Sequence, residues 1–288
     1  MTPGLLPPQV QKLYQQQLNS LPDTVTGRYQ NTELGQVWLL EAGDPQAPVL
    51  MALHGLQTPA PFLMEMLLPL TEHYRIICPD IPGQAGHSGL VAPLPVQQGY
   101  AYWLGKLMDA LELPACAMLG MSFGGAILLD AASLMPERIS AASLWVPAGF
   151  FRPVWRPIKS LLLPVLSFKL NSDQPHFDRM MDPLLGQNWP ELKAYYYAVQ
   201  EAGLPLVLIP PGPFGPEQLQ SLQAPVQLVV AEQDIYFAPD KLIKLAQYAL
   251  PELADLLRLD DLHVPSPEHR ALMAQRLGAF LHRHTAGV

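Results

Sequence analysis

Short apolar runs alternate with helix-length segments over most of this chain. Val49–Leu53 and Arg75–Pro79 have the composition of buried strands, and residues 62–73 between them have the length of a helix. The same order returns near the end, where the strand-like runs Val226–Ala231 and 254–259 flank another helical segment. Parallel strands need crossover connections, and both faces of such a sheet must be covered. The pattern predicts an α/β fold with a mostly parallel sheet.

The alternation also sets the domain organisation. Strands are predicted at residues 25–30, 37–40, 49–53, 75–79, 116–119, 141–146, 226–231 and 254–259, and helices at 62–73, 97–111, 123–135, 240–250 and 267–284. Between 148 and 216 the alternation stops, and proline and aromatic residues become frequent. Because the alternation then resumes, we expect one core domain, residues 1–147 and 217–288, with an inserted lid of short helices at 148–216.

The composition is that of a globular, acidic chain. Hydrophobic residues make up 49% of the 288 positions and charged residues 15%, which excludes a disordered chain. Lys and Arg number 17 against 25 Asp and Glu, so nucleic acid and anionic membranes are not expected partners. Without a signal-like start or an apolar run of about 18 residues, we expect a cytoplasmic protein with no membrane insertion. Cys78 and Cys116 lie in apolar runs and are expected to be buried free thiols.

The strongest local motif is G-x-S-x-G, formed by Gly120, Met121, Ser122, Phe123 and Gly124. It stands between a predicted strand and a predicted helix, the context that a nucleophile on a tight turn requires. Glycine is favoured at both flanks because a Cβ there would crowd neighbouring backbone, and the free N–H groups of the helix start favour an anion. The alternative is that Ser122 is an ordinary helix N-cap. The strand–turn–helix context favours the nucleophile.

A serine nucleophile needs a base to take its proton and a carboxylate to orient that base. In a parallel sheet the chemistry gathers at the carboxyl ends of strands, so both partners should follow late strands. Asp234 lies three residues after the strand at 226–231, and His263 lies four after the strand at 254–259. The sequence therefore predicts Ser122 as nucleophile, His263 as general base and Asp234 as the orienting acid.

Other histidines and carboxylates are alternatives for these roles. His87 is the next candidate base, although stabilising its own loop suits it better. Asp260 and Asp261 are so close to His263 on one loop that they would struggle to reach Nδ1 while Nε2 faces the serine. Asp80 is expected to stabilise its own turn through bonds from backbone N–H groups.

With these motifs, the sequence resembles the α/β-hydrolase superfamily over nearly the whole chain outside the lid. His54-Gly55 after the third strand resembles the family's oxyanion-loop signature, and the loop from Asp80 to Ser88 resembles the one after its fourth strand. The resemblance implies the α/β-hydrolase fold: an eight-stranded, mostly parallel sheet with helices on both faces. It also implies that a helical cap is inserted after the sixth strand.

The resemblance further assigns roles near the nucleophile. It implies that the backbone N–H groups of Leu56 and Phe123 form an oxyanion hole. Two features depart from the family pattern: Leu262 precedes His263 where glycine is common, and the loop after the fourth strand is one residue longer than usual. The residues expected to shape the site are His54, Gly55, Gly120 and Gly124.

The predicted activity is that of a carboxylesterase-like serine hydrolase, which cleaves a carboxylic ester through an acyl-enzyme. An apolar lid suggests a small to medium uncharged hydrophobic ester as the substrate, and no metal or organic cofactor is required. Two alternatives use the same triad, namely a carbon–carbon bond hydrolase and a cofactor-free perhydrolase or haloperoxidase. An alternative of another class is a receptor-like homologue that binds a ligand without turnover. No oligomeric state is predicted.

Overall fold

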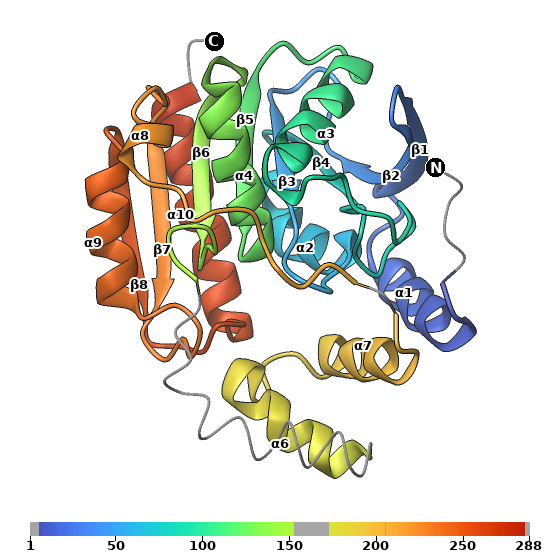
Figure 1. The fold of residues 1–288 in the computed structure, drawn as a ribbon. Coiled ribbons are helices and arrows are strands. Elements are labelled where there is room, and N and C mark those ends of the chain that lie inside the picture. Colours follow the sequence, from blue (N-terminus) through green and yellow to red (C-terminus); the bar gives the residue numbers. More distant parts are fainter. Residues whose placement is uncertain (1–5, 153–172, 205, 286–288) are drawn as a thin grey trace.

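The computed structural model describes residues 6–152, 173–204 and 206–285, and its framework is one eight-stranded sheet (Figure 1). The strands are β1 (Thr26–Thr32), β2 (Gly35–Ala42), β3 (Val49–Leu53), β4 (Arg75–Pro79), β5 (Cys116–Met121), β6 (Ile139–Trp145), β7 (Val226–Ala231) and β8 (Leu253–Leu259). Their order is β1-β2-β4-β3-β5-β6-β7-β8, in which β2 runs antiparallel to β1 and β4 and all other neighbours are parallel. The predicted eight-stranded, mostly parallel sheet is confirmed.

Helices pack on both faces of this sheet. The described helices are α1 (Pro8–Ser20), α2 (Ala60–Leu67), α3 (Val96–Ala110), α4 (Phe123–Leu134), α6 (Gln174–Leu185), α7 (Pro190–Glu201), α8 (Pro216–Leu219), α9 (Pro239–Ala249) and α10 (Pro267–Thr285), with short 3₁₀ turns η1 (Leu68–Leu70) and η2 (Pro136–Arg138). One core contains side chains of α1, α2 and α10, and the other contains side chains of α3, α4 and α9. Over the described ranges, none of these helices has both the length and the apolar character that a bilayer span requires.

The central strands are apolar on both sides because each side meets one of these cores. Leu50 of β3 belongs to the core under α1, α2 and α10, whereas its neighbour Met51 belongs to the core under α3, α4 and α9. Both are completely buried. Cys78 and Cys116 are buried free thiols, as predicted. The continuous apolar runs that suggested strands therefore reflect a sheet covered on both faces.

The chain between β6 and β7 contains α6, α7 and the short α8. Figure 1 shows α6 and α7 beyond the end of the sheet at which β7 terminates. The two helices are joined by Lys193, whose Nζ lies 2.8 Å from Asp182 Oδ1, and α7 packs against α1. Residues 153–172 and 205 of the predicted lid lie outside the described residues.

Two helices at the start of the chain differ from the sequence predictions. α1 was not predicted; it buries Val10, Tyr14 and Gln17 along one stripe, while most of its other positions are polar. The helix predicted at 62–73 is α2, which ends at Leu67 and continues only as the 3₁₀ turn η1. Pro69 explains the early end, because it has no N–H to donate into the helix.

Candidate active site

Ser122 stands on the turn between β5 and α4 in a strained backbone conformation. Its φ of 50° and ψ of −110° are values that side-chain-bearing residues rarely adopt. The Ser122 N–H donates to the Trp145 carbonyl at 2.9 Å. A Cβ on Gly124 would lie 2.1 Å from the Leu53 carbonyl oxygen, and one on Gly120 would lie 2.5 Å from the Gly124 carbonyl oxygen. The two glycines of the motif are therefore required by the closeness of neighbouring backbone.

The side chains of Ser122, His263 and Asp234 form one hydrogen-bonded chain. His263 Nε2 lies 2.9 Å from Ser122 Oγ, and His263 Nδ1 lies 2.7 Å from Asp234 Oδ2. An ionised carboxylate only accepts, so the proton belongs on Nδ1 and Nε2 accepts from the serine hydroxyl. Asp234 Oδ1 accepts from the N–H groups of Tyr236 at 2.7 Å and Phe237 at 3.0 Å, which fixes the carboxylate. The structure brings together three residues that the sequence places on separate segments.

The hydroxyl of Ser122 is not used as a helix cap. Ser122 occupies the N-cap position of α4, but its side chain makes no capping hydrogen bond. Phe123 is the first residue of α4, and the first N–H groups of a helix have no partner within it. The start of α4 therefore offers N–H groups beside the serine.

The peptide between Gly55 and Leu56 is held by its carbonyl group. The Gly55 oxygen accepts from His54 Nδ1 at 2.9 Å and from the Thr58 N–H at 3.2 Å. In a planar trans peptide the N–H points opposite to the carbonyl, so the Leu56 N–H faces away from these donors. A Cβ on Gly55 would lie 3.6 Å from the Ser122 Cβ, so this peptide lies next to the serine.

His54 holds that peptide as a neutral donor. Its Nε2 lies 2.8 Å from the Ile81 nitrogen and accepts that N–H, so its proton is on Nδ1, where it donates to Gly55. Burial lowers the pKa of His54, and the charge of Asp80 offsets this only in part. The neutral ring keeps one tautomer and therefore one direction for the Gly55–Leu56 peptide.

The alternative acids are engaged elsewhere. Asp261 Oδ2 lies 2.6 Å from Nδ1 of His269 on α10. Asp80 accepts from the N–H groups of Ala60 at 2.8 Å and His87 at 2.7 Å. Asp80 thus stabilises its own loop, as predicted, and also the start of α2.

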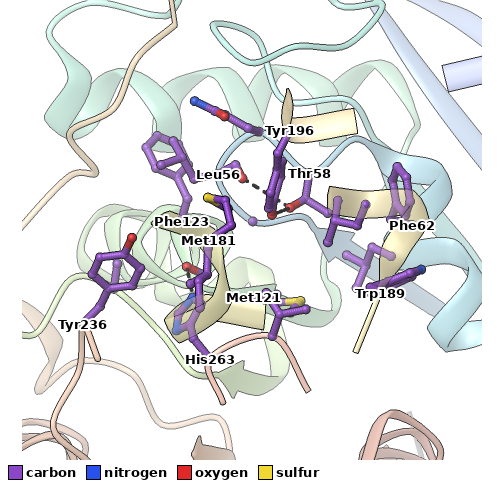
Figure 2. Close-up of a pocket in the computed structure, with 18 of the residues that line it drawn as sticks. Leu56, Thr58, Phe62, Met121, Phe123, Met181, Trp189, Tyr196, Tyr236 and His263 are labelled. Carbon is purple, nitrogen blue, oxygen red and sulfur yellow. Dashed lines mark hydrogen bonds between the residues drawn. The ribbon is translucent and has the colours of Figure 1, made fainter. Parts of the chain in front are cut away.

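A cavity of about 380 Å³ contains Ser122 and His263 in its wall. Figure 2 shows Phe62 and Trp189 on one side of this pocket and Tyr236 and Phe123 on the other. Its lining, taken from the described part of the chain, includes no Asp, Glu, Lys or Arg. In those same ranges no group of three or more His, Cys, Asp or Glu side chains is placed to hold a metal ion. The insert supplies much of the wall: Met180, Met181, Leu184, Trp189, Leu192, Tyr196 and Gln200.

Sequence reasoning missed these wall residues of α6 and α7. Leu192, Tyr196 and Gln200 are spaced four apart, and so are Met180 and Leu184, which places each set on one helix face. This four-residue spacing is the sequence feature by which the wall residues could have been found. It marks a helix face, but it does not distinguish a face that lines a cavity from one that packs in a core.

Tyr196 also ties the insert to the loop at Leu56. Its hydroxyl lies 2.6 Å from Thr58 Oγ1, which in turn lies 3.2 Å from the Leu56 carbonyl oxygen. Burial raises the pKa of Tyr196, so the phenol stays protonated. α7 is therefore hydrogen-bonded to the loop whose peptide borders the serine.

Comparison with known protein families shows to which family the chain belongs. Residues 48–269 match the family model described as the alpha/beta hydrolase fold. The chain belongs to this family. The fold, the strand–turn–helix position of Ser122 and the match agree with the resemblance seen in the sequence.

This α/β hydrolase is similar over nearly its whole length to proteins of Bacillus subtilis. The uncharacterized carboxylesterase nap is 24% identical over 284 residues, covering 94% of this chain and 92% of the relative. Carboxylesterase YbfK is 22% identical over 278 residues, covering 93% and 92%. The crystal structure of naproxen esterase superposes with a TM-score of 0.79 at 21% identity, covering 95% of this chain and 97% of that one.

The structure explains the two departures from the family pattern. Leu262, in place of the common glycine, lies against the insert: a Cβ on Gly186 would be 3.2 Å from Leu262 Cδ1. The longer loop after β4 folds back on Asp80, where a Cβ on Gly86 would lie 2.7 Å from the carboxyl carbon. Neither departure displaces His263 or Ser122 from their hydrogen bond.

Proposed function

We propose that this α/β hydrolase cleaves carboxylic esters through an acyl-enzyme on Ser122. The observation that carries the proposal is the continuous chain Ser122–His263–Asp234 in the wall of an apolar cavity. The names of the two similar B. subtilis proteins, both called carboxylesterases, support the same reaction.

The reaction proceeds in two acyl transfers. His263 Nε2 takes the hydroxyl proton while Ser122 Oγ forms a bond to the ester carbonyl carbon. The bond from that carbon to the alkoxy oxygen then breaks, and His263 gives its proton to the leaving alcohol. Water repeats the sequence on the acyl-enzyme, which releases the acid and restores Ser122. Asp234 keeps the imidazole oriented and stabilises its charged form.

The negative charge that develops on the carbonyl oxygen needs donors fixed in advance. We assign this role to the N–H groups of Leu56 and Phe123, one on the peptide that His54 holds and one at the start of α4. Such donors act strongly because they need no reorganisation, and loss of one typically costs about 10²- to 10³-fold in rate. Gly120 and Gly124 allow the close approach that brings the two segments together.

The cavity walls define the substrate class. Apolar side chains lie on both sides of the Ser122–His263 pair, so both the acyl part and the alcohol part are expected to be uncharged and hydrophobic. We treat residues 148–216 as the cap that supplies this selectivity, and residues 1–147 and 217–288 as the core that supplies the triad. A buried charge in the substrate would find no Asp, Glu, Lys or Arg partner among the wall residues that the structure describes.

A matched pair of esters tests the proposal. p-Nitrophenyl pentanoate and p-nitrophenyl hydrogen glutarate have equal acyl length, but the second ends in a carboxylate. We expect the neutral ester to be hydrolysed with a kcat/KM at least about 10²-fold higher, because the carboxylate must lose its hydration. No hydrolysis of either ester by folded protein contradicts the ester reaction, and equal rates contradict the substrate class.

A further inference from the structure

The corner between α6 and α7, residues 184–189, contacts the histidine loop, residues 260–266. The Val264 N–H donates to the Leu184 carbonyl at 3.0 Å. On the other side of His263, Leu262 lies against Gly186, where an added Cβ would come within 3.2 Å of Leu262 Cδ1. The residues directly before and after His263 therefore both touch the insert.

Asn188 of this corner reaches the histidine loop on both sides of His263. Its Nδ2 donates to Asp261 Oδ1 at 3.0 Å and to the Val264 carbonyl at 2.9 Å. These two acceptors lie two residues before and one residue after His263. One side-chain amide therefore spans the segment that carries the imidazole.

The partners of Asn188 are themselves fixed. Asp261 Oδ2 accepts from the Ser266 N–H at 2.7 Å and lies 2.6 Å from His269 Nδ1. The Asn188 N–H donates to the Leu185 carbonyl at 2.9 Å, which holds the corner's own turn. Asn188 thus joins two segments that are each held by their own hydrogen bonds.

The same corner also borders the substrate cavity. Leu184 and Trp189 line it together with His263 and Val264. The Arg270 guanidinium of α10 stacks on Trp189 at 3.7 Å from the ring centre, which anchors that end of the corner. A substrate that fills the cavity therefore touches the segment that holds the histidine loop.

We propose that Asn188 is a positioning residue for His263, through which the docked insert holds the imidazole in line with Ser122. The inference rests on the proposed function, since His263 matters in this way only as the general base. Asn188 touches no reacting atom. Its contribution is to kcat, because a small displacement of a general base weakens proton transfer more than it weakens binding of an apolar ester.

The test compares Asn188→Ala with Gln187→Ala, an exposed neighbour on the same corner. With p-nitrophenyl pentanoate, Asn188→Ala is expected to lower kcat by about 10- to 10²-fold while KM changes by less than about 3-fold. Gln187→Ala is expected to match the wild type. In proton NMR, the deshielded His263 Nδ1–H resonance from its bond to Asp234 is expected to broaden or shift in Asn188→Ala alone.

Leu262→Gly is the second variant, to be used if Asn188→Ala does not fold. It removes the second contact between the same segments and is expected to lower kcat by about 3- to 10-fold with KM unchanged. An unchanged kcat and resonance in the folded variant, a change in KM alone, or an equal loss in Gln187→Ala overturns the inference. Turnover that persists in Ser122→Ala overturns the proposed function instead, so the two failures are distinguishable.

Discussion

The turn that carries Ser122 and the loop that carries His263 are held in place by different kinds of contact. At the serine turn the demands are steric: a Cβ on Gly120 would meet the Gly124 carbonyl oxygen, and one on Gly124 would meet the Leu53 carbonyl oxygen. At the histidine loop, hydrogen bonds from side chains hold the segment, and the one from Asn188 to Asp261 joins residues 73 positions apart. The glycines of a contiguous motif therefore permit the serine turn, whereas the position of the proposed base depends on how the insert and α10 dock.

The largest expected effect comes from removing the hydroxyl of Ser122. Ser122→Ala removes the proposed nucleophile, and kcat for a neutral ester is expected to fall by about 10⁴- to 10⁶-fold. The turn is expected to keep its fold, since the strained backbone is held by the Ser122 N–H and the flanking glycines rather than by the hydroxyl. Steady-state kinetics and thermal unfolding of the same preparation measure both. A variant that loses its fold together with its activity would show that the hydroxyl itself is needed to hold the turn.

The second largest effect is expected at Asp234, which follows β7 of the sheet and binds His263. Asp234→Asn presents an amide where a carboxylate accepts from His263 Nδ1, so the imidazole loses its preferred tautomer. We expect kcat to fall by about 10⁴-fold, with little change in KM. Kinetics with p-nitrophenyl pentanoate measure it. A loss below about tenfold would show that contacts other than the bond to Asp234 orient the imidazole.

A third prediction tests the steric argument for the serine turn. Gly124→Ala places a methyl group 2.1 Å from the Leu53 carbonyl oxygen, so backbone must shift. We expect the free energy of unfolding in urea to fall by about 3 to 5 kcal/mol. Gly215→Ala is the control, because the nearest atom to its new methyl is 3.7 Å away. Equal stability of the two variants would show that the turn has room to adjust.

The smallest expected effect concerns the acid response of the histidine loop. Burial opposes the charge on Asp261, but bonds from Ser266, His269 and the Leu262 N–H outweigh it and hold its pKa below the usual 3.8. A carboxyl with a depressed pKa stabilises the fold fully above its unfolded value and loses that contribution as the pH falls through its folded value. Wild-type stability is therefore expected to fall below pH 3.8 more steeply than that of Asp261→Asn.

The control for this variant is its stability at neutral pH. There Asp261→Asn is expected to be less stable than the wild type by about 1 to 2 kcal/mol, because it loses charge-assisted bonds. Urea unfolding at both pH values measures the difference. Parallel pH dependences in the two proteins would show that Asp261 does not contribute to acid sensitivity.

The same contrast explains what the sequence could predict. Ser122 and its glycines form a contiguous motif, and Asp234 follows β7, all of whose residues are buried. His263 follows β8, an edge strand that is only partly buried and includes Asp255 and Arg258, so its strand pattern is weaker. The role of Leu262 required the structure, since its contact with Gly186 depends on docking between segments far apart in the chain. α1 escaped prediction because only a narrow stripe of it is buried.

The residues of the cavity wall could not be predicted from the sequence for a related reason. Tyr196 and Leu192 lie on a helix face whose period is visible in the sequence, but that period is the same for a face in a core. What α7 faces is decided by its contacts with α1 and by the bond from Tyr196 to Thr58. Sequence patterns thus point to the triad that we propose, while tertiary contacts determine what surrounds it.

Covalent labelling tests the central claim most directly. Incubation with phenylmethanesulfonyl fluoride followed by intact-mass and peptide analysis is expected to give one sulfonyl adduct, on Ser122, with parallel loss of ester hydrolysis. Labelling is expected to be absent in Ser122→Ala and strongly slowed in His263→Ala, because the base that activates the hydroxyl is gone. Full loss of hydrolysis with the adduct on another residue, or hydrolysis that survives complete labelling of Ser122, would contradict the account.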